Sequence, residues 1–467
     1  MDTTLSRRRL MAGTAASLLP GVLAVPARAA AMPPIGLIAE RRTIDVDGRA
    51  ASVFGIRQPD GTPGLVLAPG QRFTVNVLNR CGEATIVHWH GQTPPVLQDG
   101  VAETGGAIIQ TGAAQAYDFA ARPGTHWMHS HHGLQEQALM AAPLIVRTAQ
   151  DVRADVQEVT VLLHDFSFRD PAELLASVTG GTQAMPGMDM AAHSAGPDLN
   201  DVEYDAYLAN DRTLGDPLVV RAPGGGRVRL RLINGATTTA FWIDTGALEA
   251  TIVAVDGNPV RPVAGRRFPL AQGQRLDLLV IIPGIGGAFP VLAQREGSRA
   301  RTGIVLASAG AVVRKLPAMA QAAAVAIDNA WERRLMAEAP LAPAPVGVTH
   351  RVALTGAMMP YVWSIDDRTW ADHRPLRVAK GQRVVLEMTN RSRMAHPMHL
   401  HGHHFQVVGL DGVTLAGAVR DTVLVPVDGS VTVAFDADNA GRWLFHCHNL
   451  FHMATGMMTE LAYDATA

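Results

Sequence analysis

Three segments of the chain repeat one pattern at nearly equal intervals, and this repeat constrains the fold more than any other feature. The segments are GQRFTVNVLN at 70–79, GGRVRLRLIN at 225–234 and GQRVVLEMTN at 381–390. Each begins with glycine, continues with alternating residues of β character and ends in asparagine, a pattern typical of a half-buried strand. Their starts lie 155 and 156 residues apart, which indicates three copies of a whole domain.

The rest of the chain agrees with a three-domain organisation. Its 467 residues are too many for one hydrophobic core, and much of the sequence is short runs of β character separated by Gly and Pro turns. We therefore predict an all-β fold of three β-sandwich domains over 35–148, 155–310 and 345–465. The Ala-rich segment 311–344 is predicted to be a linker with one short helix.

The first 29 residues are predicted to be an export signal. SRRRLM at 6–11 is a twin-arginine-type motif, and the apolar stretch after it is too short for a convincing membrane span. ARA at 27–29 predicts cleavage after Ala29. We expect twin-arginine export to the periplasm without stable membrane insertion. A formal net charge of -2 and no lysine-rich patch argue against nucleic acid as a partner.

Histidine pairs occupy equivalent places in the first and third repeats. HWHG at 88–91 and HLHG at 399–402 lie 311 residues apart, which equals the sum of the two repeat spacings. PGTHWMHSH at 123–131 likewise parallels AGRWLFHCH at 440–448. The matching place in the second repeat, 243–245, has no histidine. We therefore expect the outer domains to meet and build a shared site.

The alternation of a strand explains the His-x-His spacing. Residues i and i+2 point to the same face, so each pair aims two imidazoles into one space. Eight such histidines are enough for a cluster of several metal ions: His88, His90, His129, His131, His399, His401, His446 and His448. Cys447 stands between the last two and points to the opposite face, toward a separate metal.

The surroundings of Cys447 in the sequence match one kind of metal site. A thiolate with two imidazoles and a weak axial methionine is the ligand set of a blue-copper electron-transfer site. His452 and Met457 follow the cysteine, and His396 precedes it as the second imidazole. Met457 is also compatible with simple core packing. Zinc is a poor alternative, because its chemistry does not require one cysteine with ten histidines.

At these residues the chain resembles the multicopper oxidases, the family of laccases, bilirubin oxidases and bacterial cuprous oxidases. The resemblance covers almost all of the chain after the export signal, and no ligand position is vacant. It implies three cupredoxin-like Greek-key β-sandwiches with a copper cluster between the first and third. It also implies four copper ions, namely a type 1 copper held by His396, Cys447, His452 and axial Met457, a type 2 copper held by His88 and His399, and a type 3 pair held by His90, His129, His131, His401, His446 and His448.

The resemblance further implies an activity. A reductant gives single electrons to the type 1 copper, the electrons pass along Cys447 to the flanking histidines, and the cluster reduces O2 to water. Asp99 matches an acid that relatives place beside the type 2 copper, so we assign it proton delivery; a turn aspartate before Gly100 is the alternative. Many bacterial relatives carry a proton-moving glutamate where this chain has Met453. Another acid substitutes for it, or proton supply depends more on Asp99.

Methionines near the type 1 motifs bear on the substrate. The motifs contain Met394, Met398, Met453 and Met458, and an insertion at 184–193 adds a Met-rich segment. Because thioethers favour Cu(I), we expect Cu(I) oxidation in copper tolerance, with phenols as accompanying donors. An insertion without function is an equally open interpretation.

Two other classes of cupredoxin-like protein are alternatives to an oxidase. A copper-free or copper-storing scaffold protein of the cell-division type shares the three-domain fold, and the intact ligand positions count against it. A two-domain nitrite reductase does not fit the number of domains or the paired HxHG motifs.

Overall fold

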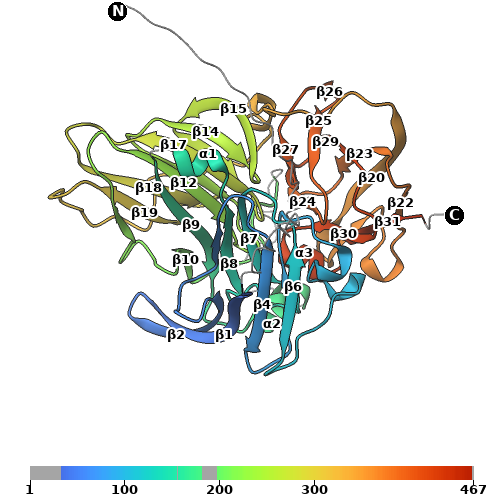
Figure 1. The fold of residues 1–467 in the computed structure, drawn as a ribbon, viewed down its shortest axis with the longest axis horizontal. Helices are drawn as coiled ribbons and strands as arrows, with labels where there is room; N and C mark the ends of the chain where they lie inside the picture. The colour runs from blue at the N-terminus through green and yellow to red at the C-terminus, as the bar shows by residue number, and fades with distance from the viewer. Residues whose placement is uncertain (1–32, 155, 181–196, 465–467) are drawn as a thin grey trace, which may run out of the picture. The chain divides into compact units, whose positions relative to one another are not determined.

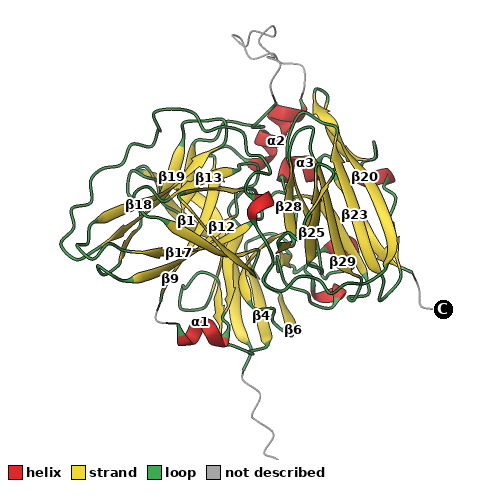
Figure 2. Ribbon diagram, turned by 90° about the horizontal axis from the view of Figure 1, so that it is seen from above, coloured by secondary structure: helices red, strands yellow, loops and turns green. Residues whose placement is uncertain are grey.

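The computed structural model describes residues 33–154, 156–180 and 197–464, whose strands form three pairs of packed sheets (Figures 1 and 2). Each pair encloses its own hydrophobic core, so the predicted all-β fold of three sandwiches is confirmed. The predicted export signal and the Met-rich insertion lie outside the described residues. In the described part of the chain, no helix is long and apolar enough to cross a membrane.

The first sandwich packs two four-stranded sheets together. One sheet has the order β2 (Arg49–Arg57), β1 (Ile35–Val46), β4 (Phe73–Arg80), β6 (Ala114–Phe119), and the other β3 (Leu65–Leu67), β8 (Ala141–Val146), β7 (Gly124–Ser130), β5 (Val87–His88). Two 3-10 helices, η1 (Val96–Gln98) and η2 (Ala102–Thr104), lie between β5 and β6. In the core, the Phe73 ring contacts those of Trp89 and Phe119, with centroids 4.6 and 4.5 Å away.

The second sandwich has larger sheets and two short helices. Its larger sheet has the order β10 (Ala206–Ala209), β9 (Gln157–Phe166), β12 (Arg227–Asn234), β17 (Arg275–Ile281), β14 (Ala250–Val255), β15 (Asn258–Gly265). Its smaller sheet has the order β11 (Val219–Arg221), β19 (Arg301–Ala307), β18 (Ala288–Arg295), β13 (Phe241–Asp244), β16 (Arg267–Leu270). Helix α1 (Ala149–Arg153) precedes β9 and starts with a capping box formed by Thr148 and Asp151. Helix α2 (Pro171–Thr179) follows β9 and is capped by the Asp170 side chain.

The third sandwich follows the segment 311–344, in which the helical structure is the 3-10 helix η4 (Glu332–Arg334). Its larger sheet has the order β21 (Tyr361–Ile365), β20 (Val346–Met358), β23 (Arg383–Asn390), β29 (Ser430–Asp436), β25 (Phe405–Leu410), β26 (Val413–Thr414), and β27 (Val419–Arg420) also pairs with β25 in this sheet. Its smaller sheet has the order β22 (Leu376–Val378), β31 (Met458–Tyr463), β30 (Arg442–Cys447), β24 (His396–Leu400), β28 (Thr422–Val425). The 3-10 helix η5 (Trp370–Asp372) precedes β22, and helix α3 (Leu450–Ala454) joins β30 to β31.

The three repeated segments form three equivalent strands. β4, β12 and β23 each run parallel to the first strand of their sandwich and antiparallel to the strand on the other side. The glycines that open the repeats, Gly70, Gly225 and Gly381, have φ angles of 72°, 76° and 84°. Glycine adopts this left-handed conformation without steric cost. The repeat is therefore a glycine turn followed by a central strand.

The asparagine that ends each repeat holds the chain where it crosses from one sheet to the other. Its side-chain oxygen accepts a hydrogen bond from the N–H two residues later, at 2.8, 3.0 and 2.9 Å for Asn79, Asn234 and Asn390. Its amide group donates to carbonyl oxygens, those of Glu83 and Ile109, of Thr239 and Leu270, and of Met394 and Val425, respectively. Because all three asparagines are buried and fully bonded, the residue type is required at this crossing.

A buried ion-pair network joins the second sandwich to the first. Asp277 on β17 accepts hydrogen bonds from Arg229 at 2.6 Å, from Arg231 at 3.0 Å and from the Thr125 hydroxyl of β7 at 2.7 Å. Asp277 and Arg231 are both buried. Two arginines of one sandwich and a hydroxyl of its neighbour therefore meet at a single carboxylate, while Arg229 also pairs with Asp151 and Arg231 with Glu158.

Asp277→Ala is expected to lower the free energy of unfolding by up to about 3 kcal/mol, because it removes one of the carboxylates that pair with the buried Arg231. Urea unfolding followed by tryptophan fluorescence measures the change. The matched control is Glu387→Gln, which removes the exposed partner of Arg351 and should cost less than about 1 kcal/mol. Equal stability of the two variants would contradict a structural role of the network.

Candidate metal centres

The histidines of the four His-x-His pairs come together where the first and third sandwiches meet. In the first sandwich His88 on β5 lies opposite His129 on β7, and in the third His399 on β24 lies opposite His446 on β30. Between the sandwiches, the rings of His90 and His399 stack with centroids 3.8 Å apart. Figure 1 shows β7, β24 and β30 near the centre of the view. The structure thus brings together pairs more than 300 residues apart.

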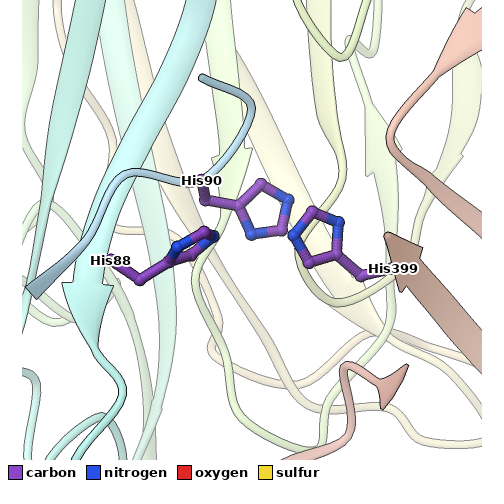
Figure 3. Close-up of side chains that lie close together, drawn as sticks. All are labelled: His88, His90 and His399. Atoms are coloured by element: carbon purple, nitrogen blue, oxygen red, sulfur yellow. The ribbon is translucent and has the colours of Figure 1, made fainter. Parts of the chain in front are cut away.

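The candidate ligand atoms form compact groups of three. In each group the atoms lie within 4.8 Å of one another, and the groups without a carboxylate are His88, His90 and His399; His90, His129 and His448; His131, His401 and His446; and His396, Cys447 and His452. Figure 3 shows the rings of His88 and His90, which leave one segment of the first sandwich, converging with the ring of His399. Three groups share one space, and the group with the cysteine is separate from them.

In several cluster imidazoles an oxygen atom binds one ring nitrogen and the other ring nitrogen has no hydrogen-bond partner. The Nδ1 atoms of His88 and His399 donate to the backbone oxygens of Asp99 and Asp421, at 2.9 and 2.8 Å. Four Nε2 atoms are buried without a hydrogen-bond partner, those of His88, His129, His131 and His399. Buried polar atoms in proteins are nearly always paired. These free nitrogen atoms therefore fit bound metal ions.

His90 is turned the other way. Its Nε2 lies 3.0 Å from the Oδ1 atom of Asp421 and 3.1 Å from the hydroxyl of Thr422. Its Nδ1 faces Nε2 of His448 at 3.2 Å. His90 therefore offers Nδ1 to a metal, whereas His88 and His399 offer Nε2.

Burial favours the neutral form of seven imidazoles of the cluster. It lowers the pKa of both His446 and His448 to about 3. For five others, burial and then neighbouring charged groups hold the pKa well below the ordinary value: His90, His129, His131, His399 and His401. Since metal ions bind neutral imidazole, these seven histidines are in the form that binds metal at neutral pH.

Cys447 lies on the face of β30 opposite to His446. Its Sγ is 3.7 Å from Nδ1 of His396 and 3.6 Å from Nδ1 of His452, and these nitrogens are 3.1 Å apart. All three side chains are fully buried, as is Met457, whose backbone oxygen accepts the N–H of Cys447. Burial raises the pKa of the thiol, so the thiolate needs a bound cation to form.

Three side chains that the sequence did not single out hold the imidazoles beside the cysteine. The Ser392 hydroxyl lies 2.7 Å from Nε2 of His396, and a carboxylate oxygen of Asp201 lies 3.2 Å from Nε2 of His452. The indole of Trp363 stacks on His452 with centroids 4.1 Å apart. Both imidazoles consequently turn Nδ1 toward the thiol. Asp201 belongs to the second sandwich, and no local pattern in the sequence marks it.

Asp99 contacts the cluster directly. Its Oδ2 lies 2.8 Å from Nδ1 of His401 and its Oδ1 3.4 Å from Nδ1 of His88. The side chain is 1% exposed, although Gly100 after it does adopt a turn conformation with a φ of 80°. The residue therefore ends a turn and places a carboxylate between ligands of both outer sandwiches.

Two more buried acids near the cluster were missed by the sequence analysis. An oxygen of Glu136 lies 2.8 Å from Nδ1 of His129, and burial raises the pKa of Glu136 to about 7. Asp421 binds His90 as described above. Glu136 follows β7 in a turn and Asp421 precedes β28, and neither has a spacing from its histidine that predicts contact.

The methionines near the type 1 motifs are mostly core residues. Met394, Met398 and Met458 are buried, and Met453 packs partly buried against the core of the third sandwich. They do not form an exposed group of thioethers.

Comparison with known proteins identifies the family. Multicopper oxidase family models match residues 39–151, 157–309 and 343–466. The chain therefore belongs to the multicopper oxidase family, with three cupredoxin-like domains. It is an oxidoreductase whose cofactor is copper, and the free nitrogen atoms described above fit that cofactor.

Individual relatives span nearly the whole chain. "Multicopper oxidase MmcO" of Mycobacterium tuberculosis is 32% identical over 440 residues, which cover 90% of this chain and 85% of that protein. A copper resistance protein A homolog of Pseudomonas syringae pv. tomato is 26% identical, with 99% and 100% covered. The crystal structure of a multi-copper oxidase from Pseudomonas thermotolerans superposes with a TM-score of 0.71 at 25% identity, covering 92% and 99%. Other relatives are named laccases.

The buried neutral histidines are expected to make the stability of the copper-free protein depend on pH. His126 and His446 have a pKa lowered by burial to about 3, against an ordinary 6.5, so protons bind mainly to the unfolded chain. Their stabilisation is therefore full above pH 6.5 and is lost as the pH falls toward 3.

The free energy of unfolding should fall by about 1.4 kcal/mol per pH unit below 6.5 for each such histidine. Urea unfolding of the copper-free protein at pH 7, 6 and 5 measures this slope. A stability that is constant or rises toward pH 5 would contradict it.

Proposed function

We propose that this protein couples one-electron oxidation of Cu(I) and phenolic donors at a type 1 copper to the four-electron reduction of O2 to water at a trinuclear copper cluster. The observation that carries the proposal is the segment 446–448. Its cysteine belongs to one group of ligand atoms, while its two histidines belong to the groups of the other site. A single short segment therefore reaches both sites.

The groups of ligand atoms support an assignment of every copper ion. In this assignment the type 1 copper would be held by His396, Cys447, His452 and Met457, and the type 2 copper by His88 and His399. One type 3 copper would be held by His90, His129 and His448, and the other by His131, His401 and His446. Bound copper supplies reversible one-electron transfer, and four electrons with four protons convert one O2 into two water molecules. The assignment uses each predicted ligand once.

The protein's own residues set the geometry of electron and proton supply. Cys447 is joined by peptide bonds to His446 and His448, which gives the shortest covalent path between the two sites. Asp99 is the proton donor of the proposal, because its buried carboxylate touches His88 and His401. Met453 offers no acid, and Glu136 is a second buried acid beside the cluster.

The substrate class is inferred from relatives. Some relatives are named copper resistance protein A and others laccase, which favours Cu(I) and phenols as donors. We place the activity in copper tolerance in the periplasm after twin-arginine export. The unpaired buried nitrogen atoms count against a copper-free scaffold, whose core would be expected to satisfy them.

The purified protein, loaded with copper, is expected to contain four copper ions per chain and to take up O2 when Cu(I) or a phenol is added. Cys447→Ser should abolish the blue absorption and reduce O2 uptake by at least about 100-fold, because it removes the thiolate ligand at which the path to the cluster begins. The copper count should fall by one. Copper binding without O2 uptake in the unaltered protein would support storage instead.

Asp99→Asn is expected to lower turnover by about 100-fold or more, because the amide cannot donate a proton in the catalytic step. The blue absorption should stay normal, since Asp99 lies at the cluster and not beside Cys447. The control is Asp118→Asn, which alters an exposed aspartate of β6 paired with Arg72. Turnover unaffected by Asp99→Asn would remove this residue from the mechanism.

A further inference from the structure

The second sandwich reaches the cluster through one buried arginine, although it supplies no ligand. Arg275, the first residue of β17, is 1% exposed and forms a two-point ion pair with Asp421 of the third sandwich. Its Nη1 donates to Oδ1 at 2.6 Å, and its Nη2 donates to Oδ2. The same guanidinium donates to the backbone oxygens of Thr125, at 3.2 Å, and Gly273, at 3.0 Å. Bonds to all three sandwiches therefore fix its position.

Asp421 in turn orients two cluster histidines. Its Oδ1 accepts the hydrogen bond from Nε2 of His90 at 3.0 Å, and its backbone oxygen accepts that from Nδ1 of His399 at 2.8 Å. The Thr422 hydroxyl donates to the same Oδ1 at 2.9 Å. One residue thus sets the opposite orientations of two stacked imidazoles, with its side chain and its backbone.

The ion pair keeps Asp421 an acceptor. Both oxygens of the Asp421 carboxylate accept hydrogen bonds from the Arg275 guanidinium, which is always charged and only donates. An ionised carboxylate only accepts hydrogen bonds, so Nε2 of His90 carries the proton. The lone pair of the neutral ring is then on Nδ1, the atom that faces His448.

The glycine of the first HxHG motif leaves room for this arrangement. A Cβ on Gly91 would lie 2.6 Å from Nη2 of Arg275 and 3.0 Å from Oδ2 of Asp421. These distances are too short for any larger residue. Glycine directly after His90 therefore leaves the space that the ion pair between Arg275 and Asp421 occupies.

We propose that Arg275 is a positioning residue of the copper cluster: acting through Asp421, it holds His90 with Nδ1 toward the metal. The inference rests on the proposed function, because it takes His90 as a copper ligand. It gives the second sandwich a part in the oxygen-reducing site.

Arg275→Lys tests this proposal. Lysine keeps the charge but cannot form two parallel bonds to a carboxylate. The matched control is Arg231→Lys, because Arg231 is also a buried arginine of the second sandwich and binds Asp277 and Thr125. Arg275→Lys should weaken copper binding at the cluster by about 10- to 100-fold in a chelator titration, with the type 1 blue absorption retained. Arg231→Lys should bind copper as the unaltered protein does.

A second measurement does not depend on copper or turnover. In the copper-free full chain labelled with [15N]histidine, the ring nitrogens of His90 should show one tautomer, protonated at Nε2, and Arg275→Lys should mix the tautomers. If Arg275→Lys does not fold, Asp421→Asn replaces it. This variant keeps the backbone acceptor of His399, so only His90 should change.

The outcomes distinguish a failure of the proposed role of Arg275 from a failure of the proposed function. Normal cluster affinity together with an unchanged His90 tautomer in the folded variant would overturn the role of Arg275. An unaltered protein that binds no copper at the cluster would overturn the proposed function, while the tautomer in the copper-free chain would still decide whether Arg275 positions His90.

Discussion

The hydrogen bonds that orient the buried imidazoles, and so decide which ring nitrogen of each one faces the others, are the constraint on which the centre of this structure depends. Backbone oxygens bind Nδ1 of His88 and His399, and a carboxylate binds Nε2 of His90. Since these acceptors come from both outer sandwiches, the docking of the sandwiches decides which nitrogen atoms stay open. The arrangement leaves buried atoms unpaired, and metal ions are the partners whose chemistry suits them.

The three sandwiches contribute different kinds of residue to the candidate metal centres. The outer two supply the candidate ligands, and the middle one supplies charged groups around them. Arg275 reaches the cluster through Asp421, Asp201 contacts His452 beside the cysteine, and Asp277 bonds to the first sandwich. The side chains of Arg275 and Asp201 are buried and hydrogen-bonded, so a sandwich without ligands still helps to hold imidazoles of the two outer sandwiches.

Much of the fold and the ligand set could be predicted from the sequence, because both depend on local patterns. The glycine-to-asparagine repeat marks a strand and its crossing, and the alternation of a strand explains the His-x-His pairs. The residues that hydrogen-bond to the candidate ligands could not be predicted from the sequence. Asp201 and Arg275 meet their partners across 251 and 146 residues, respectively, and no periodicity connects them. Which ring nitrogen of His90 faces the metal also depends on such a distant partner, Asp421.

The pairing of β24 with β30 has a further consequence. Met398 lies opposite Cys447 and His399 opposite His446, so the order of side chains along β30 assigns sulfur to one centre and nitrogen to the other. A slip of one residue would exchange the faces and destroy both centres together. A change in loop length would leave this register intact, whereas a one-residue deletion or insertion within β30 would shift it.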